Sequence, residues 1–201
     1  APWSSSRLIR KMLNVQHPLA MGASWNQRRD SQRHNELKGH AMTIAVGEKI
    51  PSTNFVQPTA DGPQGVSSDE FFKGKRVALF SVPGAFTPTC SAKHLPGFVE
   101  HAADLKAKGI DEIACTAVND AFVMGAWGKA SGVDGKVTML ADGNGDFVKA
   151  VGLEMDGSKF GMGPRGQRFA MVINDGTVEH LFVEGPGEFR VSSAEYMLEN
   201  I

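Results

Sequence analysis

The chain has 201 residues and a mass of 21.6 kDa, a size that suits one domain, or one domain with a short appendage. Hydrophobic residues make up 41% of it and charged residues 21%, which excludes a wholly disordered or collagen-like chain. No apolar run approaches the roughly 20 residues that cross a bilayer. With 21 basic residues against 22 acidic ones, there is no overall charge to attract nucleic acid.

The first 41 residues differ in composition from the rest of the chain. Residues 1–41 hold seven basic and two acidic residues, which leaves 14 basic and 20 acidic residues for 42–201. The segment has no long apolar stretch, so a secretory signal is not expected. Its arginine and serine content suits an organellar transit peptide, and an upstream extension before a start at Met42 fits equally well. We expect residues 1–41 to be mobile and residues 42–201 to form the globular domain.

From Met42 onward, short β-rich runs alternate with helical patterns. Strands are predicted at residues 75–82, 112–118, 137–141, 168–173 and 177–183, and helices at 89–108, 120–131, 145–152 and from Ser192. Asn174-Asp175-Gly176 is a hairpin signal, residues 67–70 and 192–195 read as capping boxes, and Pro96 should kink its helix. This order predicts an α/β sandwich with a central mixed β-sheet flanked by helices.

Cys90 is predicted to lie in the first turn of a helix. Pro83 and Gly84 end the preceding strand, Thr87 is a suitable N-cap, and Pro88 occupies the position where proline is favoured. The unpartnered N–H groups of a first turn favour an anion by about 0.3–1 kcal/mol, and by up to ~2 kcal/mol when it is partly buried. Because the thiolate is the reactive form of cysteine, this position favours a nucleophilic thiol over a packed core residue.

Two nearby groups suit a small substrate held over that sulfur. The hydroxyl of Thr87 can both donate and accept a hydrogen bond. A guanidinium beside the sulfur would favour the thiolate further, and both Arg165 and Arg168 are candidates. Residue spacing alone does not choose between these two arginines, and either can equally be a surface ion-pair residue.

The segment PGAFTPTCSAKHLPGF, starting at Pro83, resembles the active-site motif of the peroxiredoxins, and in particular their type 5, or plant type II, branch. The similarity continues in further ordered blocks, at residues 116–122, 125–128, 140–142 and 167–173. It spans nearly all of residues 42–201. A single P-x-x-x-T-x-x-C would be a weak signal, whereas several blocks in order are highly specific.

The resemblance implies a thioredoxin-like fold and a thiol-dependent peroxidase. It implies that Cys90 is the peroxidatic cysteine, that Pro83 shields its sulfur, that Thr87 orients the peroxide and that Arg168 completes the site. It also implies a homodimer and no metal or organic cofactor. It further implies that Gly84, Phe86 and Phe122 lie near the substrate pocket, with the dimer contact as the alternative place for the two phenylalanines.

The second cysteine, Cys115, lies in the middle of a predicted strand and is expected to pack in the core. In the resembled family, the atypical two-cysteine members resolve the sulfenic acid within the chain by a cysteine in the C-terminal region, and residues 187–193 hold none. The sequence therefore fits the one-cysteine pattern. We expect an external thiol reductant, with glutathione alone or through a glutaredoxin favoured and thioredoxin as the alternative. Sparse cysteine also favours a reducing compartment, the cytoplasm, or an organelle such as the mitochondrion if residues 1–41 are a transit peptide.

Other patterns are interpreted as structural. His94 and His101 are expected on the surface of the first helix, and Phe86, Phe122 and Trp127 in the core. Residues 161–166 satisfy G-x-G-x-x-G without the flanking strand and helix that a nucleotide site requires. Residues 142–153 begin like a calcium loop but lack its glycine and final glutamate, so a turn and helix cap is preferred.

Two further functions remain open on the same fold. A thiol–disulfide oxidoreductase would favour a C-x-x-C motif, but Thr87 stands where the first cysteine of such a motif would be, three residues before Cys90. A redox sensor or holdase would oxidise Cys90 without efficient turnover. A cysteine hydrolase is disfavoured because no histidine is placed beside Cys90 by the sequence pattern.

Overall fold

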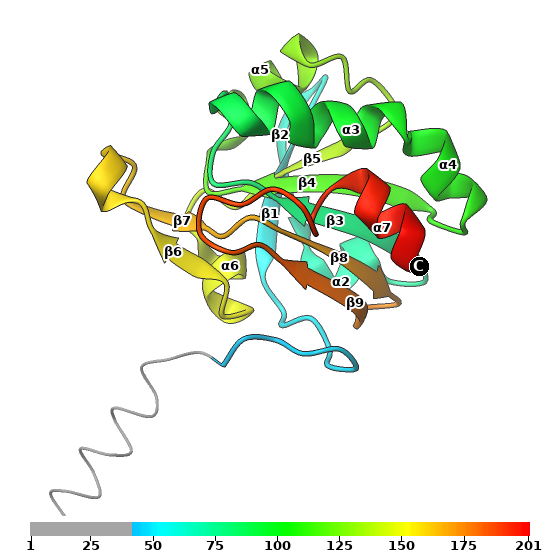
Figure 1. Cartoon of the computed structure of the whole chain (residues 1–201). Coiled ribbons are helices and arrows are strands. Elements are labelled where there is room, and N and C mark those ends of the chain that lie inside the picture. The colour runs from blue at the N-terminus through cyan, green and yellow to red at the C-terminus, as the bar shows by residue number, and fades with distance from the viewer. Residues whose placement is uncertain (1–41) are drawn as a thin grey trace, which may run out of the picture. The chain divides into compact units, whose positions relative to one another are not determined.

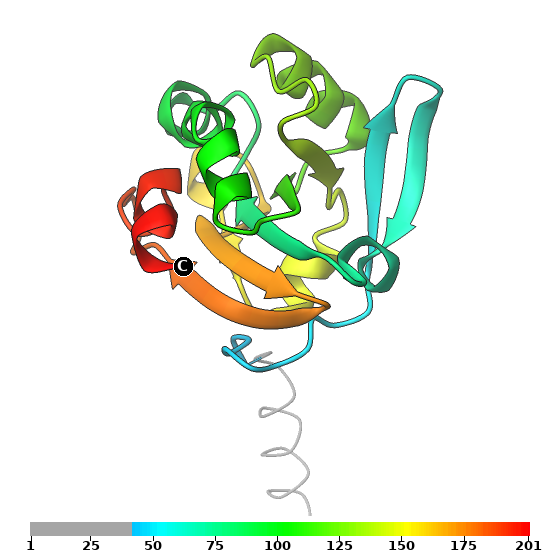
Figure 2. The same ribbon diagram turned by 90° about the vertical axis from the view of Figure 1, so that its right-hand side faces the viewer.

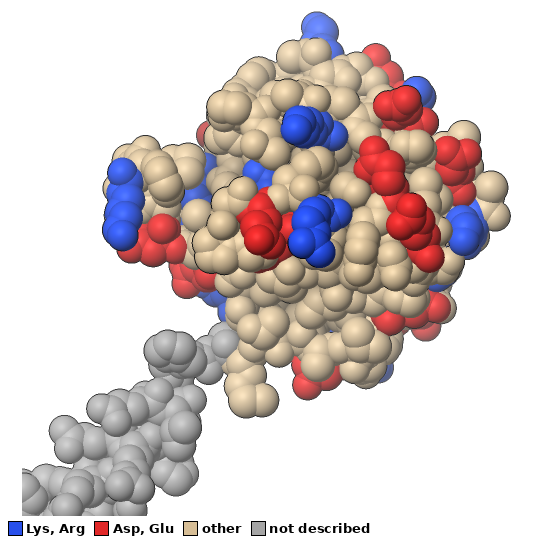
Figure 3. All heavy atoms as spheres, in the orientation of Figure 1, with Lys and Arg blue, Asp and Glu red and all other residues tan. Residues whose placement is uncertain are grey.

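The computed structural model describes residues 42–201. The expectation that residues 1–41 form a mobile extension lies outside the described residues. Within residues 42–201, no helix is long and apolar enough to cross a membrane. Lysine and arginine are interspersed with aspartate and glutamate on the face shown in Figure 3, with no gathered basic patch over the sheet or its helices.

A seven-stranded mixed sheet forms the centre of the domain (Figure 1). Its strand order is β2-β1-β5-β4-β3-β8-β9, in which β3, β4 and β5 run parallel and the other neighbours are antiparallel. The strands are β1 (Asn54–Thr59), β2 (Gly62–Ser67), β3 (Arg76–Ser81), β4 (Glu112–Ala117), β5 (Thr138–Ala141), β8 (Phe169–Asn174) and β9 (Thr177–Val183). The five predicted strands are confirmed to within about two residues, and the β1–β2 hairpin is an addition that the apolar pattern did not reveal.

Helices cover both faces of this sheet (Figure 2). One layer holds α3 (Leu95–Glu100), α4 (Ala102–Ala107), α5 (Ala121–Ala130) and α7 (Ala194–Asn200). The other holds α2 (Ser68–Phe72) and α6 (Asp146–Ala150). A small separate sheet, with β6 (Glu154–Asp156) and β7 (Pro164–Gly166) joined through η2 (Ser158–Phe160), projects at one side (Figure 1).

Successive side chains of β3 point to opposite faces of the sheet, and both faces are buried, which explains the continuous apolar run in its sequence. Val77 and Leu79 belong to the core under α2 and α6, whereas Ala78 and Phe80 belong to the core under the larger helical layer. A strand buried on both faces needs apolar residues at every position. β3 is therefore the central strand of the domain, and the loop that follows it emerges between well-packed layers.

The β8–β9 hairpin is confirmed at Asn174-Asp175-Gly176. Asp175 and Gly176 have φ values of 47° and 76°, the left-handed backbone that a two-residue turn of type I′ requires at both central residues. β8 then pairs antiparallel with β3, with Ser81 opposite Phe169. Because of this register, the residue just before β8 lies beside the loop that leaves β3.

The predicted helix over residues 89–108 is divided. Its backbone is helical from Pro88, and a π turn, η1 (Cys90–His94), precedes α3 and α4. Proline at position 96 lacks the N–H that would bond four residues back, and the chain widens so that the N–H of Leu95 reaches Cys90 instead. The predicted kink at Pro96 thus takes the form of this widened turn.

Helix capping agrees with the sequence at one of two positions. The Ser67 hydroxyl accepts from the Glu70 N–H at 3.2 Å, as a capping box requires. At α7 the prediction is wrong by one residue, because Ser193 caps the helix and accepts from the Tyr196 N–H at 3.1 Å. Ser192 is instead buried and bonded to Glu184.

Candidate active site

The loop after β3 is fixed by backbone and side-chain contacts. The N–H of Val82 donates to the Thr116 carbonyl at 3.1 Å, and the N–H of Ala85 donates to Asn119 Oδ1 at 3.0 Å. A Cβ added to the buried Gly84 would lie 3.3 Å from Thr87 Cγ2, which is tighter than ordinary van der Waals contact. The loop therefore turns closely around Gly84 and delivers the chain to the helix start.

Thr87 is the last residue before the helical backbone begins at Pro88, as expected for an N-cap. Its hydroxyl donates to the Gly84 carbonyl at 2.9 Å instead of accepting from the first turn. A hydroxyl has one hydrogen and two lone pairs, so this bond uses the donor and leaves acceptor capacity. Thr87 can consequently accept the hydrogen of a bound O–H group.

Cys90 is the third helical residue and is fully buried with a free thiol. Its sulfur faces Arg168, whose Nη2 donates to Cys90 Sγ at 3.4 Å. Arg168 is half-buried and directly precedes β8, so the antiparallel β3–β8 register brings it to the helix start. The structure thus joins Arg168 to Cys90, and Thr87 lies three residues before Cys90 at the start of the same helix.

Arg165, the rival cation, has another role. Its Nη1 donates to the Val118 carbonyl at 2.9 Å and its Nε to the Met162 carbonyl at 2.9 Å. These bonds tie the loop after β4 to the projecting β6–β7 sheet. Of the two arginines, Arg168 is the one with a bond to the cysteine sulfur.

The prediction that His94 is a surface residue is wrong. His94 is fully buried on the helix face of Cys90, among the rings of Phe80, Phe98 and Phe189. Its Nε2 donates to the Ser192 carbonyl at 2.9 Å, which leaves Nδ1 to accept from Arg168 Nη1 at 3.0 Å. The i, i+4 spacing from Cys90 to His94 and from His94 to Phe98 places these three residues on one helix face, and this spacing is the sequence signal that could have shown the burial of His94.

The pKa of His94 is lowered to about 3 from 6.5, mainly by burial and further by the Arg168 charge, with the Ser192 bond opposing. Between these values the unfolded chain binds a proton that the folded chain does not. The free energy of unfolding should therefore decrease as pH falls below about 6.5, by up to ~1.4 kcal/mol per pH unit from this group. Urea titrations at pH 7 and pH 5 should show a smaller decrease for His94→Asn than for the unmodified chain. Equal decreases would contradict a neutral His94.

Cys115 is confirmed as a core residue. It lies in β4 opposite Phe80 and Met139 and is fully buried. Burial raises the pKa of the Cys115 thiol well above its usual range, and Cys90 adds to the shift. A buried thiol held protonated is a poor nucleophile.

The aromatic residues divide differently from the prediction. Trp127 is buried as expected, and its Nε1 donates to Ser91 Oγ at 3.0 Å. Phe86 and Phe122 are 57% and 75% exposed, so placing them in the core was wrong. Phe86 has a φ of 60°, a strained conformation for a non-glycine residue, which turns its ring outward from the loop. Pro83 is half-buried in the same loop.

The patterns set aside as structural keep that interpretation. Asp142 is buried and its carboxylate accepts from the Phe147 and Val148 N–H groups at 3.0 Å each, so it caps α6. The G-x-G-x-x-G segment at residues 161–166 ends in strand β7, whereas a nucleotide site requires a helix there. Within residues 42–201, no three His, Cys, Asp or Glu side chains are grouped to hold a metal ion.

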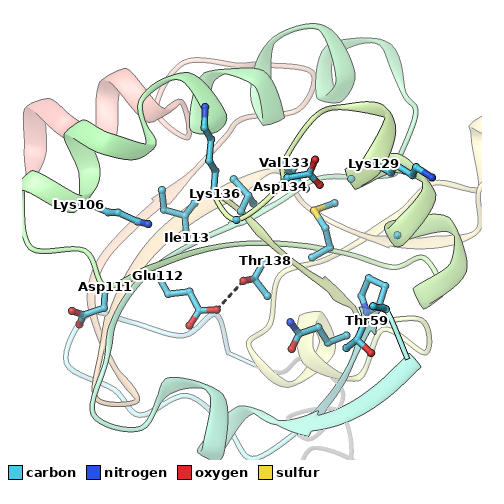
Figure 4. A pocket seen from close by; sticks show the side chains of 18 residues that line it. Thr59, Lys106, Asp111, Glu112, Ile113, Lys129, Val133, Asp134, Lys136 and Thr138 are labelled. Carbon is cyan, nitrogen blue, oxygen red and sulfur yellow. Dashed lines mark hydrogen bonds between the residues drawn. The ribbon is translucent and has the colours of Figure 1, made fainter. Parts of the chain in front are cut away.

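A groove of about 950 Å³ lies at the opposite, N-terminal ends of β4 and β5 (Figure 4). Acidic and basic side chains alternate around it, and Glu112 at its base is already bonded to Thr138 and Lys75. It contains neither cysteine. The chemistry of the described residues is therefore concentrated at Cys90 and not in this groove.

Comparison with known proteins agrees with this geometry. Residues 45–198 match the redoxin family. The chain is 49% identical over 162 residues to chloroplastic peroxiredoxin-2E-2 of Oryza sativa subsp. japonica, covering 78% of this chain and 72% of the relative. It is 48% identical to peroxiredoxin-2B of Arabidopsis thaliana, covering 78% and 97%. Reduced Prx3 of Vibrio vulnificus in complex with H₂O₂ has 52% identity and a TM-score of 0.76, with 78% and 98% covered.

The chain thus belongs to the redoxin family and, within it, to the peroxiredoxins. Its thioredoxin-like α/β fold, with a mixed central sheet flanked by helices, is that of the peroxiredoxin structures. It is a thiol peroxidase enzyme, a class of antioxidant oxidoreductase that acts on hydroperoxides with a thiol reductant and needs no prosthetic group.

Proposed function

We propose that Cys90 is the peroxidatic nucleophile and that Thr87 and Arg168 bind the peroxide beside it. The observation that carries this proposal is the bond from Arg168 Nη2 to Cys90 Sγ, at 3.4 Å, in the first turn of a helix. The Thr87 hydroxyl, which keeps acceptor capacity, suits the peroxide O–H, and Pro83 shields the sulfur from bulk solvent. Stopped-flow oxidation of the reduced protein tests the assignment; a rate no faster than that of free cysteine would contradict it.

The proposed step balances as a two-electron exchange. The Cys90 thiolate attacks one peroxide oxygen in line, an S–O bond forms and the O–O bond breaks. The departing oxygen takes the electron pair and a proton and leaves as water or an alcohol, while the sulfur becomes a sulfenic acid. Negative charge grows on the departing oxygen, so donors such as Arg168 stabilise the transition state more than the ground state.

The substrates we propose are hydrogen peroxide and organic hydroperoxides. The Vibrio vulnificus relative, described in complex with H₂O₂, supports the first of these. Gly84 is buried against Thr87 and lets the loop carry that hydroxyl into the pocket, and the exposed rings of Phe86 and Phe122 would form an apolar rim for an alkyl group. Comparison of hydrogen peroxide with cumene hydroperoxide measures the contribution of this rim.

We propose an external thiol as the reductant, with glutathione alone or through a glutaredoxin favoured over thioredoxin. The other thiol within residues 42–201 is that of Cys115, which lies in the middle of β4 between β3 and β5 and whose pKa is raised by burial, so it is a poor nucleophile. Mass spectrometry after one equivalent of peroxide and excess glutathione should show a glutathione adduct on Cys90. A disulfide between Cys90 and Cys115 would contradict this proposal and its one-cysteine, type 5 assignment.

Two related functions are separated by assay. A thiol–disulfide oxidoreductase would reduce insulin disulfides, and we expect no such activity because Thr87 stands where a second cysteine would be needed. A sensor or holdase would oxidise once without turnover. Sustained peroxide consumption with glutathione and glutaredoxin is the expected result.

We further propose a homodimer whose contact includes Phe86 and Phe122. These two large apolar side chains are exposed at 57% and 75%, near the loop and at the start of α5. Aromatic side chains are enriched at such contacts. Sedimentation equilibrium of the protein and of Phe122→Glu tests this, and a monomer for both would contradict it.

For the compartment, we propose import into an organelle in preference to the cytoplasm. The basic composition of residues 1–41 supports this, and the relative from Oryza sativa is named as chloroplastic. Fusion of residues 1–41 to a fluorescent protein gives the test, and uniform cytoplasmic fluorescence would contradict the proposal.

A further inference from the structure

A buried carboxylate outside the reacting groups organises the loop between β9 and α7. Glu184 directly follows β9 and is 8% exposed. Its Oε1 accepts from the Arg190 N–H at 2.6 Å, the Ser192 N–H at 2.8 Å and the Ser192 hydroxyl at 2.9 Å. Oε2 is also buried and has no partner. A buried carboxyl group needs hydrogen-bond partners, and the three bonds that Glu184 accepts all come from this one loop.

The loop held by Glu184 presents two groups to the histidine above Cys90. The Ser192 carbonyl accepts from His94 Nε2 at 2.9 Å. The Phe189 ring lies edge-on to His94, with 5.0 Å between ring centroids, and 5.7 Å from the Arg168 guanidinium carbon. The backbone of Glu184 also donates to the Arg168 carbonyl at 3.0 Å. His94 and Arg168, the two residues of this contact, are therefore each bonded to Glu184 or to the loop that it holds.

The Ser192 carbonyl decides which ring nitrogen of His94 carries the proton. A carbonyl oxygen only accepts, so Nε2 must be the protonated nitrogen, and Nδ1 is left with a lone pair. That lone pair accepts from Arg168 Nη1 at 3.0 Å, while Nη2 of the same planar guanidinium lies 3.4 Å from Cys90 Sγ. In the other tautomer, Nδ1–H would face the guanidinium N–H and the contact would be repulsive.

We propose that Glu184 is a positioning residue for peroxide reduction: it holds Ser192 so that His94 keeps the tautomer that fixes the Arg168 guanidinium on the Cys90 sulfur. The proposal rests on the proposed function in that it takes Cys90 and Arg168 as the reacting pair. Glu184 acts through three intermediates and touches neither sulfur nor peroxide. Its effect is expected in the transition state, where Arg168 meets the charge on the departing oxygen.

The test compares two reactions of the same sulfur. In Glu184→Met, the rate constant for oxidation by hydrogen peroxide should fall by about tenfold or more, whereas alkylation of Cys90 by iodoacetamide, which builds no charge on oxygen, should change by less than about threefold. Glu184→Gln keeps the Oε1 acceptor and the side-chain size and should recover most of the peroxide rate. Glu188→Met removes an exposed carboxylate from the same loop and serves as the matched control, with no change in either rate.

A double-mutant cycle separates positioning from general loosening. In an Arg168→Met background, Glu184→Met should cause no further loss in the peroxide rate, because the group it positions is absent. The same loss in both backgrounds, or an equal fall of the peroxide and iodoacetamide rates, would overturn the proposal. If Glu184→Met does not fold, Ser192→Ala takes its place: it deletes one of the three bonds and should lower the peroxide rate by about threefold.

A nitrogen-15 NMR spectrum of the histidine side chains tests the tautomer without any assay of activity. His94 should be protonated at Nε2 in the reduced protein and in Glu188→Met, and should show a mixture of tautomers in Glu184→Met. A proton on Nδ1 in the unmodified protein would overturn the proposal. If the unmodified protein proves slow with peroxides while this tautomer is observed, the proposed function fails and the positioning contact stands.

Discussion

Cys90→Ser should abolish peroxide consumption, while Cys115→Ala should leave it nearly unchanged. The reason is geometric, because Cys90 is the cysteine at the helix start with an arginine N–H on its sulfur, and Cys115 is packed within β4. A serine hydroxyl at position 90 is not ionised at neutral pH and cannot carry the two-electron step. Peroxide consumption under steady state, with glutathione and glutaredoxin present, measures both variants.

Cys115→Ala provides the control for folding as well as for chemistry. Removing one buried sulfur leaves a small cavity and should lower the free energy of unfolding by about 1–2 kcal/mol. Urea denaturation measures this change. A large loss of peroxidase activity in a folded Cys115→Ala protein would show that the second thiol takes part in turnover, and the one-cysteine scheme would then be wrong.

Arg168→Met should slow oxidation of Cys90 by hydrogen peroxide by about 10²–10³-fold, the effect of removing one donor to a developing oxyanion. The side chain of methionine keeps much of the packing against Phe189 and removes the N–H groups that reach Cys90 and His94. Single-turnover stopped-flow measurement isolates this step from the recycling reaction.

Arg190→Met is the matched control for that substitution. Arg190 is exposed in the 185–192 loop, and it is the backbone N–H of this residue, not its side chain, that bonds Glu184. The same loss of charge should therefore have little effect there. A rate in Arg168→Met close to that of the unmodified protein would remove Arg168 from the site and would leave the Cys90 thiolate without its cation.

Much of the fold could be predicted from the residues, since five strands and the hairpin turn follow from apolar runs and from Asn174-Asp175-Gly176. Cys90 and Thr87 could be placed at a helix start because Pro83, Gly84 and Pro88 are local signals that need no tertiary structure. What could not be predicted depends on contacts between distant segments. The β1–β2 hairpin is rich in glycine, proline and glutamine and shows no clean alternation.

The arginine and the histidine of the site show the same limit. The choice of Arg168 over Arg165 depends on the β3–β8 register. From the sequence alone, only the resemblance to the peroxiredoxins favours Arg168. The expectation for His94 is wrong because its hydrogen-bond partners, Ser192 and Arg168, come from distant segments of the chain. No sequence pattern indicates that Glu184 is buried, because a glutamate that follows a strand is ordinarily solvated. Its burial depends on how the 185–192 loop folds back over it.

The widened turn at Cys90–His94 has a consequence for how this helix tolerates changes in length. Such a turn holds one residue more than a regular α turn, so it is the structural trace of a single-residue insertion. Deleting one residue between Ser91 and Lys93 would let this turn close as a regular α turn, with the N–H of Leu95 bonded four residues back and the downstream helix kept in its orientation. His94 would stay on the inner face of the helix, within reach of Arg168. The segment can therefore lose one residue without a change in the rest of the fold, which a regular helical turn could not.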